Sequence, residues 1–245
     1  MRFIYNPCID PYYNLACEEY LLKNGAEDVA MLWRNANAVI IGRNQVAADE
    51  VDAVCAERHG VKVVRRMTGG GAVYHDLGNI NYTFIVRNGA SSLNDNDSGA
   101  IDFARFAAPV VAFLNKLGVP AECSGRNDIT AGGKKISGTA KAMHDADVLF
   151  HGTLLVETDL ERLSCVLKPN YDKLKRHGIE SVSARIANLK ELTGLNTDEL
   201  LALLSAEFKA SGFIENPLTA EEAAEIEKLR DEKYAAREWT YGEIV

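Results

Sequence analysis

Strand-like runs of apolar residues dominate the first two-thirds of the chain, and several follow one another without a helix between them. These runs cover residues 31–35, 38–44, 61–67, 80–86, 128–143 and 149–157. The run at 128–143 is typical of a hairpin with Gly132-Gly133 as its turn, and the run at 80–86 predicts a mostly half-buried strand. Because strands and helices do not alternate regularly, the pattern predicts an α+β domain with a mixed β-sheet flanked by helices.

Helical patterns lie between some of these runs and fill the last third of the chain. The predicted helices cover residues 11–25, 47–59, 101–118, 159–167, 188–193, 198–210 and 219–234. Asp10 before Pro11 has the form of an N-cap followed by proline at the first helical position. Thr219 and Glu222 form a capping-box pattern. Residues 88–100 are too polar to pack and predict a loop.

Charge and cysteine content exclude some classes of protein. The 27 Lys and Arg residues against 35 Asp and Glu residues give a net charge of −8, which argues against binding nucleic acid or an anionic membrane. No apolar run approaches the roughly 18 residues of a membrane span, and no signal peptide is visible. The five scattered cysteines include no CxxC pair. We therefore expect reduced thiols in a cytoplasmic protein, with neither a disulfide framework nor a zinc knuckle.

Three consecutive glycines, Gly69-Gly70-Gly71, follow Arg65-Arg66 between two strand-like runs. The familiar phosphate-loop patterns GxxxxGK[ST] and GxGxxG are absent. A third glycine beside two arginines favours close approach of the backbone to an anion, where N–H groups and guanidinium converge. Taken alone, the run leaves a phosphate-binding role and a structural loop as open alternatives.

A second polar cluster consists of GRND at 125–128 and GGKKISG at 132–138. Lys134 and Lys135 are neighbours in a strand, so their side chains point to opposite faces and one can enter a pocket. A hairpin with two surface lysines is the alternative. Asn127-Asp128 has oxygen ligands for Mg²⁺, although this pair is also common in turns.

The segments LWRNANAVIIGRNQ, RRMTGGGAVYHDLGNINYTF, GRNDI, KKISGTA and FHGTLLVETDL, in this order, resemble the lipoate–protein ligase A family. The resemblance extends from residue 1 to the final EWTYG, and the element around the three glycines is its most specific part. It implies the biotin/lipoate ligase fold, which is related to the catalytic domains of class II aminoacyl-tRNA synthetases.

The resemblance also implies an activity. Lipoate is activated with ATP and Mg²⁺ to lipoyl-AMP, and the lipoyl group then passes to a lysine of an acceptor domain. The acceptors are 2-oxoacid dehydrogenase E2 subunits and the glycine-cleavage H protein. Lys135 is the implied catalytic residue. The implied contacts of ATP and lipoyl-AMP are Arg66, Gly70, Gly71, Ala72, Val73, Tyr74, Asn79, Asn127, Asp128, Lys135, Ser137 and Gly138. The implied lipoate-tail site is Trp33, His75, His151 and Gly152, and Asp128 is the implied metal ligand.

Two further hypotheses belong to other classes. An ATP-independent octanoyl or lipoyl transferase would use a cysteine nucleophile, for which Cys123 is the candidate. A non-catalytic module would bind lipoyl-AMP without turnover. Residues 1–245 are expected to form one catalytic domain without the small C-terminal domain of longer relatives. This predicts a separately encoded small accessory subunit that supports adenylation.

Overall fold

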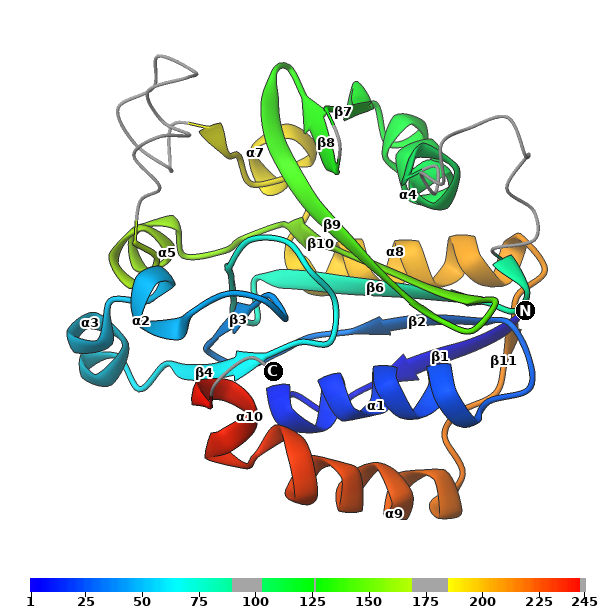
Figure 1. Ribbon diagram of the computed structural model, residues 1–245. Coiled ribbons are helices and arrows are strands. Elements are labelled where there is room, and N and C mark those ends of the chain that lie inside the picture. Colours follow the sequence, from blue (N-terminus) through cyan, green and yellow to red (C-terminus); the bar gives the residue numbers. More distant parts are fainter. Residues whose placement is uncertain (90–102, 126, 169–184, 243–245) are drawn as a thin grey trace.

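Two β-sheets organise the protein in the computed structural model, which describes residues 1–89, 103–125, 127–168 and 185–242 (Figure 1). The larger sheet has the strand order β11 (Ile214–Glu215), β1 (Arg2–Asn6), β2 (Val29–Trp33), β6 (Asn79–Val86), β10 (Asp147–Leu155), β9 (Lys134–His144), β8 (Asp128–Ala131) and β7 (Ala121–Ser124). The smaller sheet has the order β4 (Lys62–Arg65), β3 (Ala38–Ile41) and β5 (Val73–His75).

Both sheets are mixed. In the larger sheet, β1 pairs in parallel with β11 and β2, whereas β2, β6, β10, β9, β8 and β7 pair in antiparallel fashion along the row. In the smaller sheet, β3 is parallel to β4 and antiparallel to β5. The α+β prediction is therefore confirmed.

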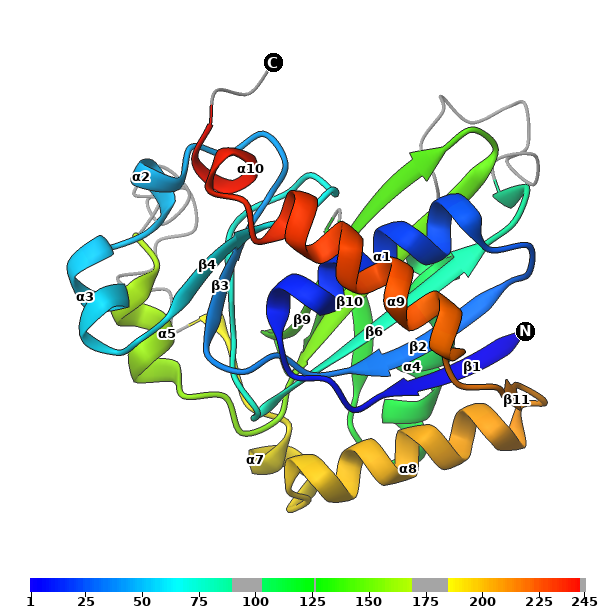
Figure 2. The ribbon, with the colours of Figure 1, turned by 90° about the horizontal axis from the view of Figure 1, so that it is seen from below.

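Helices cover both faces of the larger sheet. The helices of the described residues are α1 (Pro11–Asn24), α2 (Ala47–Glu50), α3 (Ala53–Arg58), α4 (Phe103–Lys116), α5 (Leu160–Val166), α7 (Lys190–Thr193), α8 (Thr197–Ala210), α9 (Ala220–Leu229), the π-helical turn η3 (Arg230–Tyr234) and α10 (Arg237–Tyr241), of which α2, α3, α5 and α10 lie beside the smaller sheet. Figures 1 and 2 show α1 and α9 on one face of the sheet, with α8 and α4 on the other. The result is a helix–sheet–helix arrangement in which the central strands are enclosed.

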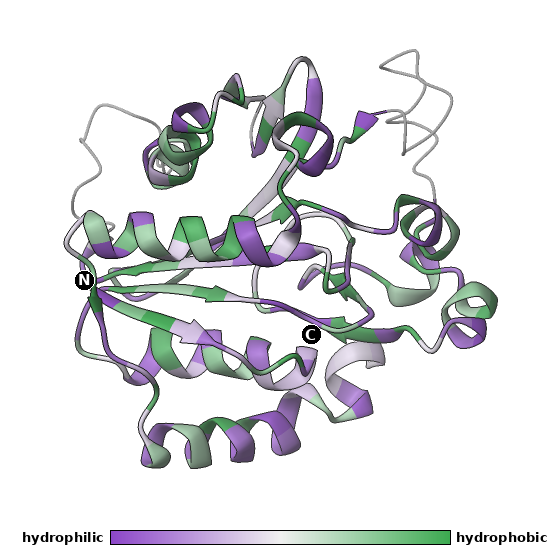
Figure 3. Ribbon diagram, turned by 180° about the vertical axis from the view of Figure 1, so that it is seen from behind, coloured by the Kyte–Doolittle hydropathy of each residue, from purple (hydrophilic) through white to green (hydrophobic). Residues whose placement is uncertain are grey.

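The two helical layers bury separate hydrophobic clusters against the sheet. On one side, Leu204 and Phe208 of α8 pack with Phe84 and Phe150 of the central strands. Figure 3 shows that apolar and polar residues both occur along α8, as in a helix with one apolar face. On the other side, α1 contributes Leu15 and its neighbours to a second cluster. Strand β6 is consequently buried along almost its whole length, and the prediction of a half-buried strand was wrong.

The structure corrects one further predicted element and adds strands that were not predicted. The helix expected at 47–59 is two helices, because Val51 pairs with Leu167 and Asp52 caps α3 by accepting a hydrogen bond from the Cys55 N–H. Strands β1, β5, β7 and β11 were not predicted. Most of the loop expected at 88–100 lies outside the described residues.

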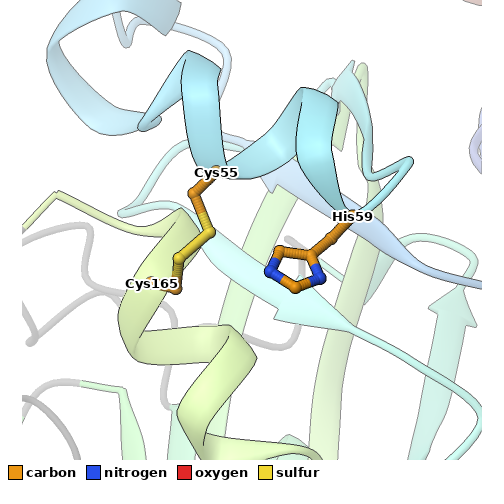
Figure 4. A group of neighbouring side chains, drawn as sticks. All are labelled: Cys55, His59 and Cys165. Carbon is orange, nitrogen blue, oxygen red and sulfur yellow. A yellow bond between two sulfur atoms is a disulfide. The ribbon is translucent and has the colours of Figure 1, made fainter.

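A disulfide joins Cys55 of α3 to Cys165 of α5, so the prediction of five reduced thiols was wrong (Figure 4). The two residues are 110 positions apart, and their Cα atoms are 6.1 Å apart. Their proximity follows from the packing of α3 on α5. Local spacing along the sequence could not show this pairing, because it depends on the tertiary fold.

The helices of the described ranges are all too short or too polar to cross a bilayer.

Candidate active site

A cavity of about 510 Å³ is bounded by both sheets, the glycine loop (residues 68–72) and the β8–β9 hairpin. Most of the predicted site residues line it: Trp33, Arg66, Gly70, Gly71, Ala72, Val73, His75, Asn127, Asp128, Lys135, Gly138, His151 and Gly152. These residues come from distant parts of the sequence, and the fold brings them to one place.

Three predicted residues lie just behind this lining. The Tyr74 side chain is buried, its hydroxyl donates to Asn37 Oδ1 at 2.8 Å, and the residue lines an adjoining cavity of about 140 Å³. Asn79 is fully buried and donates through Nδ2 to Asn81, which does line the larger cavity. The Ser137 hydroxyl is 3.2 Å from the Tyr82 hydroxyl and is also fully buried. Their buried side chains lie behind the residues that line the larger cavity.

Arg66 holds the glycine loop in place. Its guanidinium donates to the carbonyl oxygens of Gly69 at 2.6 Å and Gly71 at 2.9 Å, and Nε donates to Thr68 Oγ1 at 2.8 Å. Burial lowers the pKa of Arg66 to about 10, which leaves it charged at neutral pH. A cation that donates to loop carbonyls fixes the curvature of the loop and adds positive charge at the cavity wall.

Arg65 points the other way, as neighbouring residues in a strand do. It donates to the carbonyl oxygens of Trp239 at 2.8 Å and Thr240 at 2.6 Å in α10, and to that of Gln45 at 2.6 Å. The Trp239 indole donates back to the Arg65 carbonyl at 2.8 Å. Arg65 therefore ties the C-terminal helix to the segment before α2, and it is a structural residue here.

Only one glycine of the triplet needs glycine for its backbone conformation. Gly70 has φ +94°, in the region that side chains rarely adopt. Its carbonyl oxygen would lie 2.1 Å from a Cβ atom on Gly42, so the loop is packed against the residue that follows β3. Gly71 does not have a positive φ, and a Cβ there would meet no atom within 4 Å. Gly71 thus faces open space in the cavity.

The two adjacent lysines of β9 have different environments. Lys134 is exposed, whereas Lys135 lines the cavity and its Nζ lies 2.7 Å from Asp128 Oδ1. Gly138 permits this position, because a Cβ on Gly138 would lie 3.0 Å from Lys135 Nζ. The structure therefore directs Lys135, and not Lys134, into the cavity.

The charge of the cavity is opposite to that of the whole chain. Its lining includes four cationic side chains, Arg66, Lys135, Lys168 and Arg185, and two carboxylates, Glu50 and Asp128. In a protein with a net charge of −8, this local excess of positive charge favours an anionic ligand.

A series of buried, hydrogen-bonded side chains lies beside the apolar part of the cavity, which is lined by Leu15, Trp33 and Ile40. Trp33 Nε1 donates to Thr83 Oγ1 at 2.9 Å, and the Thr83 hydroxyl donates to Glu18 Oε1 at 2.6 Å. His151 Nδ1 lies 2.8 Å from the same Glu18 oxygen, and His151 Nε2 lies 2.9 Å from Thr68 Oγ1. Because the Glu18 carboxylate can only accept, it fixes the proton of His151 on Nδ1. These hydrogen bonds thereby connect Trp33 in the cavity lining to Thr68 of the glycine loop.

His75 presents an unpaired N–H in the cavity lining. Its Nδ1 accepts from the Asn35 amide at 3.1 Å, and that amide is oriented by Asn14, which donates to Asn35 Oδ1 at 2.9 Å. The ring proton of the neutral form is therefore on Nε2, which is buried without a partner among the described residues. Burial, with help from the nearby Arg66 and His151, lowers the pKa of His75 to about 3. A neutral donor of this kind suits a ligand atom that accepts a hydrogen bond.

Glu18, Asn81 and Arg185 were missed by the sequence prediction. The sequence contains a weak signal for Glu18, since an acid inside the apolar stretch LACEEYLL of a buried helix needs a partner. No comparable signal marks Arg185. Gly152 was predicted for the tail site, and its lack of a side chain has a structural cause as well. A Cβ on Gly152 would lie 2.3 Å from the Tyr82 hydroxyl on the paired strand.

Cys123 lies on β7 as an exposed residue and is not among the described residues that line either cavity. An acyl-transfer nucleophile must reach its substrate. This placement weighs against the transferase hypothesis.

The mixed sheet, the basic cavity and the glycine loop together define a catalytic domain suited to an anionic ligand. A family model described as the lipoyl protein ligase A/B catalytic domain matches residues 10–209. Lipoate–protein ligase 1 of Staphylococcus aureus is 40% identical over 248 residues, covering 99% of this chain and 74% of that protein. The chain therefore belongs to the lipoyl protein ligase A/B catalytic domain family.

Two solved structures are similar along their whole length. One is a bipartite lipoate protein ligase of Thermoplasma acidophilum, solved in a study that includes its E2 lipoyl domain. It has a TM-score of 0.84 and 32% identity, covering 100% of this chain and 96% of that chain. The other is a lipoate–protein ligase A bound with ATP, with a TM-score of 0.81 and 32% identity, covering 100% of this chain and 99% of that chain. The predicted fold is confirmed by these two structures.

Proposed function

We propose that the protein is an ATP-dependent lipoate–protein ligase, which forms lipoyl-AMP and transfers the lipoyl group to an acceptor lysine. The observation that carries the proposal is the cavity of about 510 Å³, in which a cationic part, around Lys135 and Arg185, adjoins an apolar part at Leu15, Trp33 and Ile40. Lipoyl-AMP has the same two parts, an anionic adenylate and an apolar acyl chain. The related ligases named above support the same activity.

In the first step, a lipoate carboxylate oxygen attacks the α-phosphorus of ATP, and the bond to the departing pyrophosphate breaks. Two anions must approach each other, and charge builds up on the phosphoryl oxygens. Fixed positive charge lowers this barrier by electrostatic stabilisation. Lys135 is held at the cavity wall by Asp128, with its Nζ 2.7 Å from the carboxylate. Backbone N–H groups of the glycine loop at Gly71 and Ala72 are the proposed contacts of the adenylate.

Mg²⁺ is the metal that such a reaction requires, and Asp128 is the proposed protein ligand. Mg²⁺ is commonly held by one or two carboxylates together with substrate phosphates, so Asp128, one of the two carboxylates in the cavity lining, fits it. One oxygen of Asp128 pairs with Lys135, which leaves the other for a metal. When bound, Mg²⁺ would neutralise the charge of pyrophosphate.

In the second step, the neutral amine of the acceptor lysine attacks the acyl carbon of lipoyl-AMP, and AMP leaves with the electron pair of the C–O bond. Lys135 stabilises the charge that develops on the leaving phosphate. The acceptor is proposed to be a lipoyl domain of the E2 type or a glycine-cleavage H protein. The Thermoplasma acidophilum study, which pairs a ligase with its E2 lipoyl domain, supports the E2 type.

The acyl tail is proposed to lie against Trp33, whose ring is held by Thr83, with His75 Nε2–H as a hydrogen-bond donor toward it. Because Glu18 fixes both Thr83 and His151, the tail wall is preorganised before the ligand binds.

The deciding experiment is intact mass spectrometry of an apo-acceptor domain after incubation with the protein, lipoate and MgATP. A lipoyl mass increment that requires ATP supports the ligase. An increment obtained from an octanoyl carrier without ATP would support the transferase instead. A protein that retains lipoyl-AMP but modifies no acceptor would be the binding module.

A small accessory subunit is proposed as a further partner in adenylation. The support is the similarity to the bipartite ligase, over 96% of that chain. Closure of a second part over an active site excludes water and completes the catalytic arrangement.

A further inference from the structure

Three metal-ligating side chains, Cys55, His59 and Cys165, lie together on the helices beside the cavity wall (Figure 4). Their ligand atoms are all within 4.8 Å of one another. His59 is the C-cap of α3, and its N–H donates to the Cys55 carbonyl at 3.1 Å. The spacing of four residues places both side chains on the same side of the helix. Cys165 comes from α5, which packs against α3.

We propose that these three residues form a Zn²⁺ site when the Cys55–Cys165 disulfide is reduced. Thiolate and imidazole are ligands that Zn²⁺ prefers. Three protein ligands with solvent in the fourth position make a complete tetrahedral site. The site is separate from the Asp128 position, and its ligands are soft where Mg²⁺ requires oxygen.

The geometry fits this metal. Zn–S and Zn–N bonds of about 2.3 and 2.0 Å place tetrahedral ligand atoms roughly 3.5–3.8 Å apart. The ligand atoms already lie within 4.8 Å, and the cysteine Cα atoms are 6.1 Å apart, so side-chain rotation suffices. Cys55 is buried, whereas His59 and Cys165 are exposed. The exposed side gives the metal a path of entry and gives its fourth position to water.

Disulfide and metal are mutually exclusive states of the cluster. A phosphine or dithiol reductant breaks the S–S bond and becomes oxidised, and each sulfur gains a proton. Binding of Zn²⁺ then forms two Zn–S bonds and one Zn–N bond and releases the two thiol protons. In either state Cys55 and Cys165 remain cross-linked, by the S–S bond in the oxidised protein and by the metal in the reduced protein.

The cross-link joins two walls of the cavity. The Asp52 N–H donates to the Val166 carbonyl at 2.9 Å, and Val51 pairs with Leu167. Glu50 and Leu167, on either side of this junction, line the cavity. The metal would therefore preserve the junction where the disulfide cannot persist.

The test is a Co²⁺ titration of the full chain after phosphine reduction and removal of the reductant under anaerobic conditions. Thiolate-to-cobalt charge-transfer bands and tetrahedral d–d bands should appear and saturate at one equivalent. Zn²⁺ should displace Co²⁺. At a 100-fold excess over its Kd, Zn²⁺ should raise the thermal midpoint of the reduced protein by about 5 °C or more. The oxidised protein should show neither the Co²⁺ bands nor the rise in the thermal midpoint with Zn²⁺.

Variants identify the ligands. His59→Ala should weaken Co²⁺ binding by about 100-fold, since even outer-shell changes cost 10–100-fold. Cys165→Ser should weaken binding at least as much and lower the charge-transfer intensity of any bound Co²⁺, because only the Cys55 thiolate remains. Cys8→Ser and Cys123→Ser are matched controls that remove thiols elsewhere. Both variants should retain the charge-transfer bands of the wild type. If Cys165→Ser does not fold, the exposed His59 variant decides alone. Absence of bands in the reduced wild type, or full-strength binding in His59→Ala, would overturn the proposal.

Discussion

Two adjacent lysines show how one residue of separation decides which side chain reaches the cavity. Lys135 faces the cavity and is paired with Asp128, while Lys134 faces solvent. Lys135→Ala should lower the rate of lipoylation by about 10²–10³-fold, as loss of a group that stabilises transition-state charge commonly does. Lys134→Ala should change the rate little. Single-turnover formation of lipoyl-AMP measures this step directly.

The stability of the Lys135 variant is the control for this prediction. The Lys135–Asp128 pair is partly exposed, and such pairs contribute about 1 kcal/mol or less to folding. The variant should therefore unfold close to the wild type. Equal rates for both lysine variants and the wild type would show that Lys135 has no role in the chemistry.

We expect His75 to make the stability of the protein sensitive to acid. Burial lowers its pKa from 6.5 in the unfolded chain to about 3 in the folded protein. The unfolded state therefore binds a proton first as the pH falls. The neutral imidazole contributes stability fully above about pH 6.5, and this contribution is lost progressively toward pH 3.

His75→Asn tests this pH dependence, because the asparagine Oδ1 can accept from Asn35 where Nδ1 did. Urea unfolding at pH 7 and pH 4.5 should show that the wild type loses about 2 kcal/mol more than the variant over this interval. Equal losses in the two proteins would mean that His75 does not titrate between these pH values.

At the scale of the element, the glycine loop combines a structural and a binding requirement. Gly70 has a positive φ, whereas Gly71 faces open space. A valine at Gly71 would occupy cavity volume without straining the backbone. Overpacking of this kind costs about 1–3 kcal/mol, so Gly71→Val should weaken MgATP binding about 10–100-fold.

Gly69→Val is the matched control, since Gly69 does not line the cavity and a Cβ there also meets no atom within 4 Å. Isothermal titration calorimetry measures both affinities, and the thermal midpoints of both variants should stay near that of the wild type. If MgATP binds both variants equally well, the loop is only a structural connection.

Elements with strong local signals were predictable from the sequence. The hairpin turn at Gly132-Gly133 has both residues at positive φ, which glycine alone adopts readily. The capping box of Thr219 and Glu222 is present with both hydrogen bonds. In the candidate site, strand alternation predicted only that Lys134 and Lys135 point to opposite faces, and the family resemblance is what selected Lys135.

Features that depend on contacts between distant segments were not predictable. The break between α2 and α3 follows from pairing with Leu167, and the disulfide follows from the packing of α3 on α5. The partner of Glu18 is His151, 133 residues further along the chain. No local pattern contains such information, because it arises only when the sheet has formed.

At the scale of the whole molecule, the open question is whether this chain completes both steps alone. The cavity supplies cationic side chains and an apolar wall, and under the proposed function we expect these to suffice for lipoyl transfer from ready-made lipoyl-AMP. Adenylation also requires exclusion of water and close alignment of two anions, which closure by a second part supplies. Loss of such alignment costs about 10²-fold. We therefore expect the chain alone to use lipoyl-AMP about 10²-fold faster than lipoate plus MgATP.

Two parallel assays on the purified chain measure this ratio, with the same acceptor domain and the same mass-spectrometric readout. Lys135→Ala serves as the control in both. It should slow the two assays together, because its charge is used in both steps, whereas a missing partner slows only the one that begins from ATP. Equal and fast rates in the two assays, with no partner added, would show that the chain adenylates lipoate unaided. The accessory subunit would then be unnecessary, and the C-terminal helices held by Arg65 would be the cover of the site.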